Sequence, residues 1–147
     1  MEITRKAEYA ISALVDLALQ EKGKYVLSRE IAERQNIPTN FIPQIMAILS
    51  RSGLVEGIRG SRGGVRLRVD PAKITVAQVV ELIEGPIAIN KCLLPEGGCR
   101  NIDTCPLHSV WVKAQDQLME VLEQTTIADV VQTKMEIDAK QKPTKGE

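Results

Sequence analysis

Aromatic residues and histidine are scarce in this sequence, and no long uninterrupted apolar segment is present. Aromatic side chains make up 3% of the 147 residues, so the hydrophobic core must consist mainly of Leu, Ile, Val and Ala. The longest apolar stretch, Ala10 to Leu19, is interrupted by Ser12 and Asp16, which argues against a membrane span. No signal or transit peptide is recognisable. We therefore expect a cytoplasmic protein with no membrane partner.

The same scarcity argues against an enzyme. His108 is the only histidine, and no nucleophile has a recognisable base beside it. The glycine-rich run from Gly57 to Gly64 differs from a phosphate-binding loop, because a strand-like segment follows it where such a loop needs a helix. We expect neither catalysis nor a small-molecule substrate.

Net charge is also absent, but the charges are unevenly distributed. The chain has 19 basic and 19 acidic side chains. Between positions 51 and 68, however, the only acidic residue is Glu56. The basic residues of this segment are Arg51, Arg59, Arg62, Arg66 and Arg68. A neutral total therefore does not argue against a polyanionic partner such as DNA.

The first half of the chain is predicted to be helical. Apolar residues at helical spacing predict a helix over residues 4–19. Ser28 is the expected cap of a short helix over 28–35, and Thr39 that of a third helix ending near 52. Two short helices joined by a tight turn are typical of a helix-turn-helix, although they also occur in other helical proteins. The polar residues at the start of the third helix are Thr39, Asn40 and Gln44.

A β-hairpin is predicted directly after the third helix. Residues 54–59 and 65–69 alternate between apolar and polar side chains, and the glycine-rich residues 60–64 form the turn. A helix-turn-helix followed by a hairpin is the order of a winged helix. Arginine at a narrow tip suits the minor groove, which predicts DNA contacts for Arg59, Ser61 and Arg62. The alternative is a solvated hairpin with ordinary surface arginines.

The second half is predicted to continue with helices. Thr75 caps a helix ending near Glu84, a long helix follows over 109–124, and Thr126 caps a short one through about Val131. The apolar stripe of the long helix must be buried, most economically against a second copy of the chain. We thus expect a mainly α protein with a small β-hairpin wing. The expected divisions are a DNA-binding domain at 1–84, a ligand-binding loop at 85–108, dimerisation and docking helices at 109–133, and a disordered tail at 134–147.

All three cysteines lie in the loop and are followed by the histidine. The spacing of Cys92, Cys99, Cys105 and His108 is Cys-x6-Cys-x5-Cys-x2-His. Three thiols cannot pair completely, and a reducing compartment argues against disulfides. The spacing lacks the tight pairs of structural zinc sites. An iron–sulfur cluster, zinc, and a metal-free thiol switch remain equal alternatives from the spacing alone.

Several motifs together resemble the IscR/NsrR family of winged-helix regulators, over nearly the whole chain to about Thr133. These motifs are Met-x-Ile-Thr at residues 1–4 with Tyr9-Ala10, Ile-Ala-Glu-Arg-Gln-x-Ile-Pro at 31–38, Gly-Leu-Val at 53–55, Arg-Gly-x-x-Gly-Gly at 59–64, and the spaced cysteines before a Trp-bearing helix. The cysteine block is the most specific of them. The resemblance implies a homodimer that holds one iron–sulfur cluster in each subunit and binds a palindromic promoter site. It also implies a repressor of cluster-biogenesis genes that is switched by cluster occupancy.

The resemblance implies two possible cluster types. Cys105-Pro106-Leu107-His108 is similar to members with a [2Fe-2S] cluster, whose ligands would be Cys92, Cys99, Cys105 and His108. Nitric-oxide-sensing or redox-responsive members carry [4Fe-4S] and take a carboxylate near the N-terminus of the partner subunit, where this chain has Glu8. We favour [2Fe-2S] and keep Glu8 as the alternative fourth ligand. A zinc- or thiol-dependent repressor of the same fold is the further alternative.

In the DNA-binding helix the chain departs from the family pattern at Pro43. The IscR pattern has an acidic residue there, which helps to select DNA sites according to cluster occupancy. A proline cannot do this, so the resemblance does not carry over to a second class of DNA site read by the cluster-free form. Thr39, Asn40 and Gln44 are expected to meet the major groove, with Gln44 the best candidate for reading a base because its carboxamide can pair with adenine.

Overall fold

The computed structural model describes residues 2–60 and 63–142. Its α-helices and strands are α1 (Arg5–Leu19), α2 (Ser28–Gln35), α3 (Ile42–Arg51), β1 (Val55–Ile58), β2 (Gly64–Leu67), α4 (Val76–Glu84), α5 (His108–Gln124) and α6 (Ile127–Gln141). Short 3-10 turns lie at η1 (Pro71–Lys73), η2 (Lys91–Leu93) and η3 (Ile102–Thr104). The predicted fold class, mainly helical with one β-hairpin, is confirmed.

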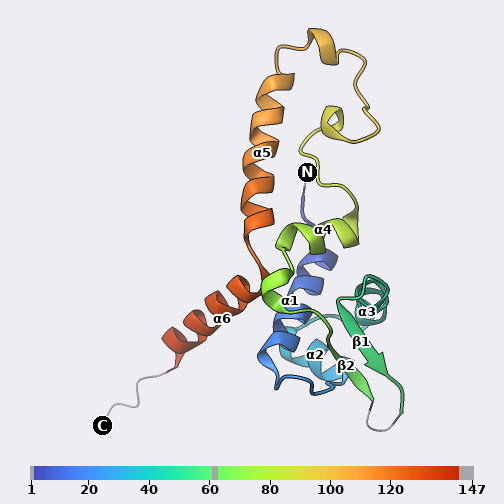
Figure 1. The fold of residues 1–147 in the computed structure, drawn as a ribbon, viewed down its shortest axis with the longest axis vertical. Helices are drawn as coiled ribbons and strands as arrows, with labels where there is room; N and C mark the ends of the chain where they lie inside the picture. The colour runs from blue at the N-terminus through green and yellow to red at the C-terminus, as the bar shows by residue number, and fades with distance from the viewer. Residues whose placement is uncertain (1, 61–62, 143–147) are drawn as a thin grey trace.

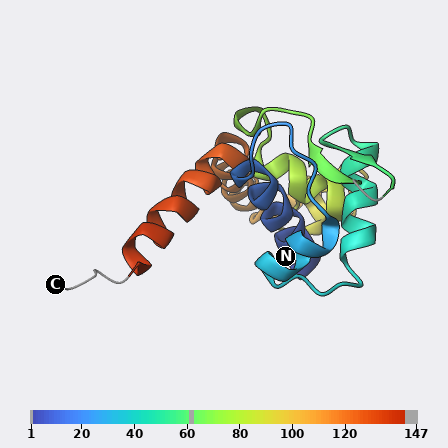
Figure 2. The same ribbon diagram turned by 90° about the horizontal axis from the view of Figure 1, so that it is seen from below.

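The elements form a body and two projections. Helices α1 to α4 and the hairpin pack together, α5 rises away from them, and the cysteine loop lies at its far end (Figure 1). Helix α6 leaves the body in another direction, which is clearest from below (Figure 2). Across the two described ranges, no helix combines the length and apolar character needed to traverse a bilayer.

Helix α1 is the centre of the body. Thr4 caps it by accepting a hydrogen bond from the backbone N–H of Ala7 at 3.3 Å. Small and aliphatic residues on its inner face let α2, α4 and α6 approach closely, and Leu14 is fully buried among them. The buried residues of α1 are Ala7, Ala10, Ala13, Leu14, Val15, Asp16 and Leu17.

A buried charge on α1 holds the helix-turn-helix in place. The carboxylate of Asp16, whose residue is 1% exposed, accepts hydrogen bonds from Arg34 Nε at 2.9 Å and Arg34 Nη2 at 2.8 Å. Gln35 Nε2 donates a third at 3.0 Å. The hydrogen bond to Asp16 raises the pKa of Arg34 further, so its guanidinium stays charged. The end of α2 is thereby fixed against α1.

Replacing Arg34 by alanine is expected to lower the free energy of unfolding by about 3 kcal/mol, because a buried carboxylate would keep only Gln35 as a partner. Urea unfolding followed by circular dichroism measures the change. Arg29→Ala, at an exposed position of the same helix, is the control and is expected to stay within about 0.5 kcal/mol of wild type. If the two variants were equally stable, burial of Asp16 would not depend on Arg34.

Two predicted helix caps are wrong. Ser28 is the first residue of α2 itself, and α3 begins at Ile42, three residues after Thr39; neither helix has a side-chain cap. The backbone N–H of Phe41 bonds to the carbonyl of Pro38 at 3.0 Å, and this turn occupies the residues expected to open the helix. Pro43 does lie in the first turn of α3, as predicted.

The hairpin is antiparallel, with Val55 opposite Leu67 and Glu56 opposite Arg66. The carboxylate of Glu56 and the guanidinium of Arg66 form an ion pair at 2.6 Å, and Arg66 also lies over the ring of Tyr25. The hairpin is held to the body through a bridge between Val26 and Val65.

Glycine is required where the hairpin meets the body. A Cβ at Gly64 would lie 2.6 Å from the carbonyl oxygen of Val26, and the backbone φ there is +154°. Position 64 therefore admits no larger residue without moving the wing.

Helix α6 is longer than predicted. We expected it to end near Val131 and residues 134–147 to be disordered, but the helix runs to Gln141; residues 143–147 lie outside the described part of the chain. Thr126 and Asp129 form a capping box, and the two hydrogen bonds from Thr126 lower the pKa of Asp129. Side-chain pairs four residues apart continue the helix beyond its apolar part. They are Gln132 with Glu136 and Lys134 with Asp138.

The corner between α5 and α6 is fastened to the start of α4. The backbone N–H of Val76 bonds to Thr125 and that of Ile127 to Ile74, both at 2.8 Å, and Thr75 and Thr126 form a β-bridge. One turn of α5 nearer the loop, apolar side chains pack on α1 and α4. This cluster comprises Ala7, Ala77, Val80 and Ile87 with Leu118, Met119 and Leu122. The lower end of α5 is thus joined to the body at two places.

Candidate metal centre and nucleic-acid interface

A cavity of about 210 Å³ lies between the cysteine loop and the start of α5. All four of the predicted ligands from the loop line it, although they are up to 16 residues apart in sequence (108 − 92). The lining residues are Asn90, Lys91, Cys92, Gly98, Cys99, Ile102, Cys105, His108 and Trp111. The structure therefore brings the three thiols and the imidazole together at one place.

Short local structures position these side chains. Cys92 lies in η2, which Asn90 caps by accepting a hydrogen bond from the Lys91 N–H at 2.8 Å. Cys105 follows η3, and its carbonyl accepts from the N–H of His108 at 3.3 Å. Cys92 and Cys105 are half-buried, Cys99 is exposed, and all three are free thiols.

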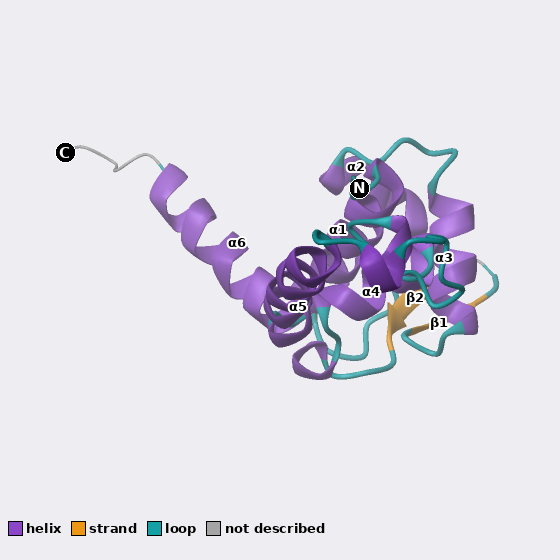
Figure 3. Ribbon diagram, turned by 90° about the horizontal axis from the view of Figure 1, so that it is seen from above, coloured by secondary structure: helices purple, strands orange, loops and turns teal. Residues whose placement is uncertain are grey.

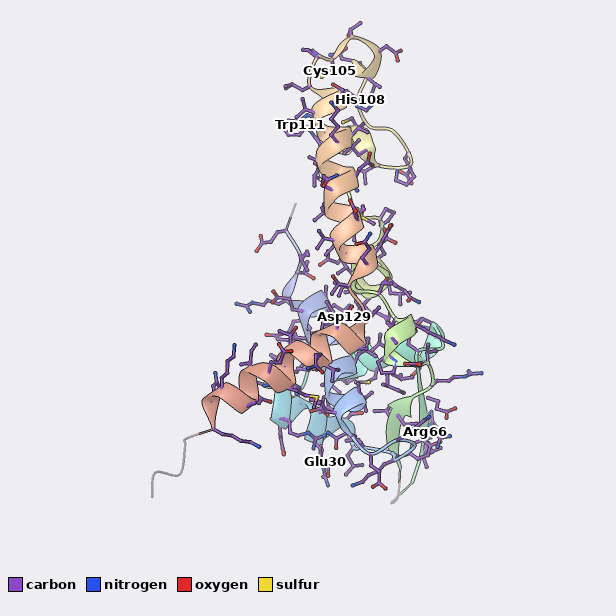
Figure 4. All side chains as sticks on the ribbon, turned by 60° about the vertical axis from the view of Figure 1, so that its left-hand side comes forward. Glu30, Arg66, Cys105, His108, Trp111 and Asp129 are labelled. Carbon is purple, nitrogen blue, oxygen red and sulfur yellow. The ribbon has the colours of Figure 1, made fainter. Side chains whose placement is uncertain are left out.

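His108 belongs to helix α5 and not to the loop, so the helix begins one residue earlier than predicted. We expected it to close the loop before a helix starting at Ser109, but it is the first residue of α5. The helix therefore fixes the backbone that carries the imidazole ring. Trp111 lies one turn further along α5, on the same side of the helix. Figure 4 shows Cys105, His108 and Trp111 grouped at the far end of α5. The sequence did not mark Trp111 as a cavity residue, although its spacing of three from His108 was available as a signal.

The imidazole of His108 provides a test of whether a metal group fits here. Its Nδ1 is buried and has no hydrogen-bond partner among the described residues. A buried polar atom without a partner is rare and calls for an explanation such as a bound ion. Thiolates and imidazole are the donors that bind zinc and iron–sulfur clusters. The donor set thus fits such a group, although within the described residues no three His, Cys, Asp or Glu side chains already stand at single-ion spacing.

Glu8 is not brought to this cavity. It is exposed on α1, where it pairs with Arg5 at 3.4 Å, and α1 lies in the body at the opposite end of α5. A carboxylate from Glu8 could reach a cysteine loop only in another copy of the chain. Its role as a ligand stays a prediction.

The predicted DNA-contacting residues that the structure describes are exposed around the start of α3 and at the end of β1. Thr39 and Asn40 are exposed in the turn before α3, and Gln44 is exposed in its first turn, with Nε2 3.5 Å from the Asn40 carbonyl. Arg59 is exposed just after β1. Ser61 and Arg62 lie outside the described residues. The opposite side of α3 is buried through Ile42, Ile45, Met46 and Leu49.

A groove of about 760 Å³ lies between the hairpin, the start of α2 and the end of α3. Its polar lining residues include Ser28, Arg29, Ser50 and Arg59. Sequence reasoning missed Arg29 and Ser50, because nothing in their local spacing shows that they face the wing. Viewed from above, α3 and the hairpin lie on the side of the body away from α6 (Figure 3).

The fold and the site together define a winged-helix DNA-binding protein that carries a cysteine-rich loop. The chain belongs to the Rrf2 family, whose model matches residues 3–133 and is described as an iron-dependent transcriptional regulator. The predicted family resemblance is thereby confirmed. So is the expectation that the protein is not an enzyme, since its relatives are helix-turn-helix transcriptional regulators.

Individual relatives are similar over most of the chain. The helix-turn-helix transcriptional regulator IscR of Escherichia coli is 31% identical over 138 residues, which is 94% of this chain and 85% of the relative. The structure of IscR from T. potens has a TM-score of 0.72 at 28% identity and covers 99% of this chain and 94% of that one. The structure of CymR, the global cysteine regulator of B. subtilis, has a TM-score of 0.73 at 26% identity and covers 90% and 98%.

Proposed function

We propose that the protein is a homodimeric repressor of cluster-biogenesis genes whose DNA binding is switched by an iron–sulfur cluster in each subunit. The observation that carries this proposal is the cavity at the start of α5. Three thiols and an imidazole with an unpartnered buried Nδ1 line that cavity, on a helix joined to a winged-helix body. The similarity to IscR supports the assignment.

Cys92, Cys99, Cys105 and His108 would hold the cluster, for which we favour [2Fe-2S]. When bound, it would supply a centre sensitive to oxidation and to iron supply. The chain's own residues provide selectivity: thiolates favour iron–sulfur groups and zinc over hard cations, and His108 makes one position weaker than a fourth thiolate would. A [4Fe-4S] cluster with Glu8 of the partner subunit remains the alternative.

The body and the loop are linked through α5. Ordering of residues 85–108 would fix the upper end of α5, while Leu118 and Leu122 hold its lower end on α4 and α1. Helix α3 packs on α1 and α4, so a change in how α5 sits would be passed to the DNA-reading surface. The coupling must be reciprocal, and DNA of the right sequence should therefore slow the loss of the cluster.

In the complex, Thr39, Asn40 and Gln44 would lie in the major groove, and Arg59, Ser61 and Arg62 would reach the minor groove and phosphates. Two copies related by a dyad would read half-sites about 34–36 Å apart, or a multiple of this, in a palindromic promoter site.

Gln44→Ala is expected to weaken binding to the preferred duplex by about 1–3 kcal/mol and to relax selectivity at one base position. Arg59→Ala should instead weaken binding to all sequences and flatten the slope of affinity against salt by about one. Fluorescence anisotropy over a salt series, on duplexes selected from a random pool, measures both effects. Lys113→Ala, exposed on α5, is the control. Equal weakening of every duplex by Gln44→Ala would contradict base reading.

Anaerobic purification of the whole chain tests the proposed function directly. We expect a coloured protein with equimolar iron and sulfide and with visible charge-transfer absorption. The loaded and stripped forms should differ in affinity for the same promoter duplex. A colourless protein that contains zinc or no metal would overturn the cluster, and identical affinities of the two forms would overturn the sensing.

A metal-free thiol switch is the second candidate function. It is favoured by the exposure of Cys99 and by the structural similarity to CymR, a cysteine regulator. It predicts that the stripped protein binds DNA differently before and after oxidation with a mild disulfide, with no dependence on iron.

A further inference from the structure

The side chain of Gln115, on α5, forms hydrogen bonds with the segment that leads into the cysteine loop. Gln115 Nε2 donates to the carbonyl of Ile87 at 2.6 Å, and Gln115 Oε1 accepts from the N–H of Ile89 at 3.0 Å. A single carboxamide therefore pairs with both backbone groups of this segment, as a neighbouring strand would. A carboxamide offers a donor and an acceptor side by side in its ordinary neutral form, which an ionised carboxylate does not.

The tied segment connects the body with the first ligand. Ile87 is buried with Ala77 and Val80, and the chain turns at Asn90 into η2, which contains Cys92. Beyond this segment the backbone hydrogen bonds among the described loop residues are local, such as the one from the Gly98 N–H to the Lys91 carbonyl at 3.4 Å. Gln115 thus supplies the long-range hydrogen bonds that locate the start of the described loop relative to α5.

Gln115 lies on α5 between the residues that line the cavity and those that pack on the body. His108 and Trp111 line the cavity, Gln115 follows one turn later, and Leu118 begins the packing on the body. The distance between Cys92 and His108 depends on where the loop leaves α4 relative to α5. Holding that segment before any ligand binds would reduce the ordering cost of assembling the ligands.

We propose that Gln115 is a positioning residue for the cluster, a role that rests on the proposed function. It fixes residues 87–89 against α5 so that Cys92 stands opposite His108, and it touches no ligand atom itself. Groups that orient metal ligands typically change metal affinity 10- to 100-fold when they are lost. A similar effect is expected here.

The test uses the whole chain with three substitutions. Gln115→Met keeps the length of the side chain but removes both hydrogen bonds, and Gln115→Glu keeps only the acceptor for Ile89. Gln78→Met makes the same chemical change at an exposed position on α4 and is the control. The readouts are the rate at which EDTA bleaches the anaerobically loaded protein, amide hydrogen exchange of Ile89 in the metal-free protein, and thermal unfolding.

We expect Gln115→Met to bleach about 10- to 100-fold faster than Gln78→Met and to lose protection at Ile89, with Gln115→Glu between them. The unfolding midpoints of the metal-free variants should be alike. Equal bleaching rates for Gln115→Met and Gln78→Met would overturn the positioning role while leaving the proposed function intact. A wild-type protein that takes up no coloured cluster would overturn the proposed function and this role with it.

Discussion

Replacing Cys92, Cys99 or Cys105 by alanine is expected to abolish the visible absorption of the anaerobically prepared protein. Each substitution removes one thiolate from the single cavity that all three share, and the remaining donors would be too few to retain a cluster. His108→Ala should have a smaller effect and yield a cluster that is lost more rapidly, because an imidazole is the weaker ligand. Absorption spectra with iron and sulfide counts measure the loss.

A matched control is available beside the ligands. Ser109→Ala changes an exposed side chain next to His108 and should leave the spectrum unchanged. The metal-free alanine variants should unfold at the same temperature as metal-free wild type, since the thiols contribute little to the core of the body. Full absorption in Cys99→Ala would remove that exposed residue from the ligand set. Full absorption in all three variants would rule out the cavity as the cluster site.

The parts of the fold that the sequence predicted depend on local patterns. Apolar spacing predicted α1, α4 and α5 nearly at their observed bounds, because each carries apolar side chains along one side. Alternation on both sides of a glycine-rich turn gave the hairpin, whose register pairs Val55 with Leu67. Of the capping box formed by Thr126 and Asp129, only the capping threonine was predicted.

The errors arise where local patterns compete or where polar residues hold a helix. The turn closed by Pro38 and Phe41 displaced the start of α3 from the threonine that looked like its cap. Helix α6 continues through a segment with little apolar content, since pairs such as Lys134 with Asp138 support it without a hydrophobic stripe.

Only part of the candidate site could be predicted from the sequence. The spacing of the cysteines and His108 indicated candidate ligands, but not that Trp111 would line the same cavity or that Gln115 would hold the loop entrance. Gln115 reaches backbone groups 26 and 28 residues away, and Arg34 reaches Asp16 over 18 residues. Contacts at such separations depend on the assembled fold and leave no periodic pattern in the chain.

The apolar stripe along α5 leads to the second large prediction, which concerns dimerisation. None of the residues of α5 is buried in the single chain; Val110 is 50% exposed and Val121 63% exposed, and Ala114 lies between them on the same side. This side lies next to the one that carries Trp111, Leu118 and Leu122, which contact the loop and the body. Pairing with a second α5 would bury it, and a dyad would place each valine in the interface twice.

Val121→Asp is therefore expected to convert the protein from a dimer to a monomer, because a charge would be buried on both sides of the dyad. Affinity for a palindromic duplex should fall by about 100-fold or more, since the two half-sites would no longer be bound by linked subunits. Analytical ultracentrifugation and anisotropy with whole and half-site duplexes measure the two effects. Asp116→Ala, on the acidic side of the same helix, should change neither. A Val121→Asp protein that remains dimeric would place the interface elsewhere. A monomer that binds the palindrome as tightly as wild type would show that each winged helix reads DNA independently, and the cluster would then have to act within a single subunit.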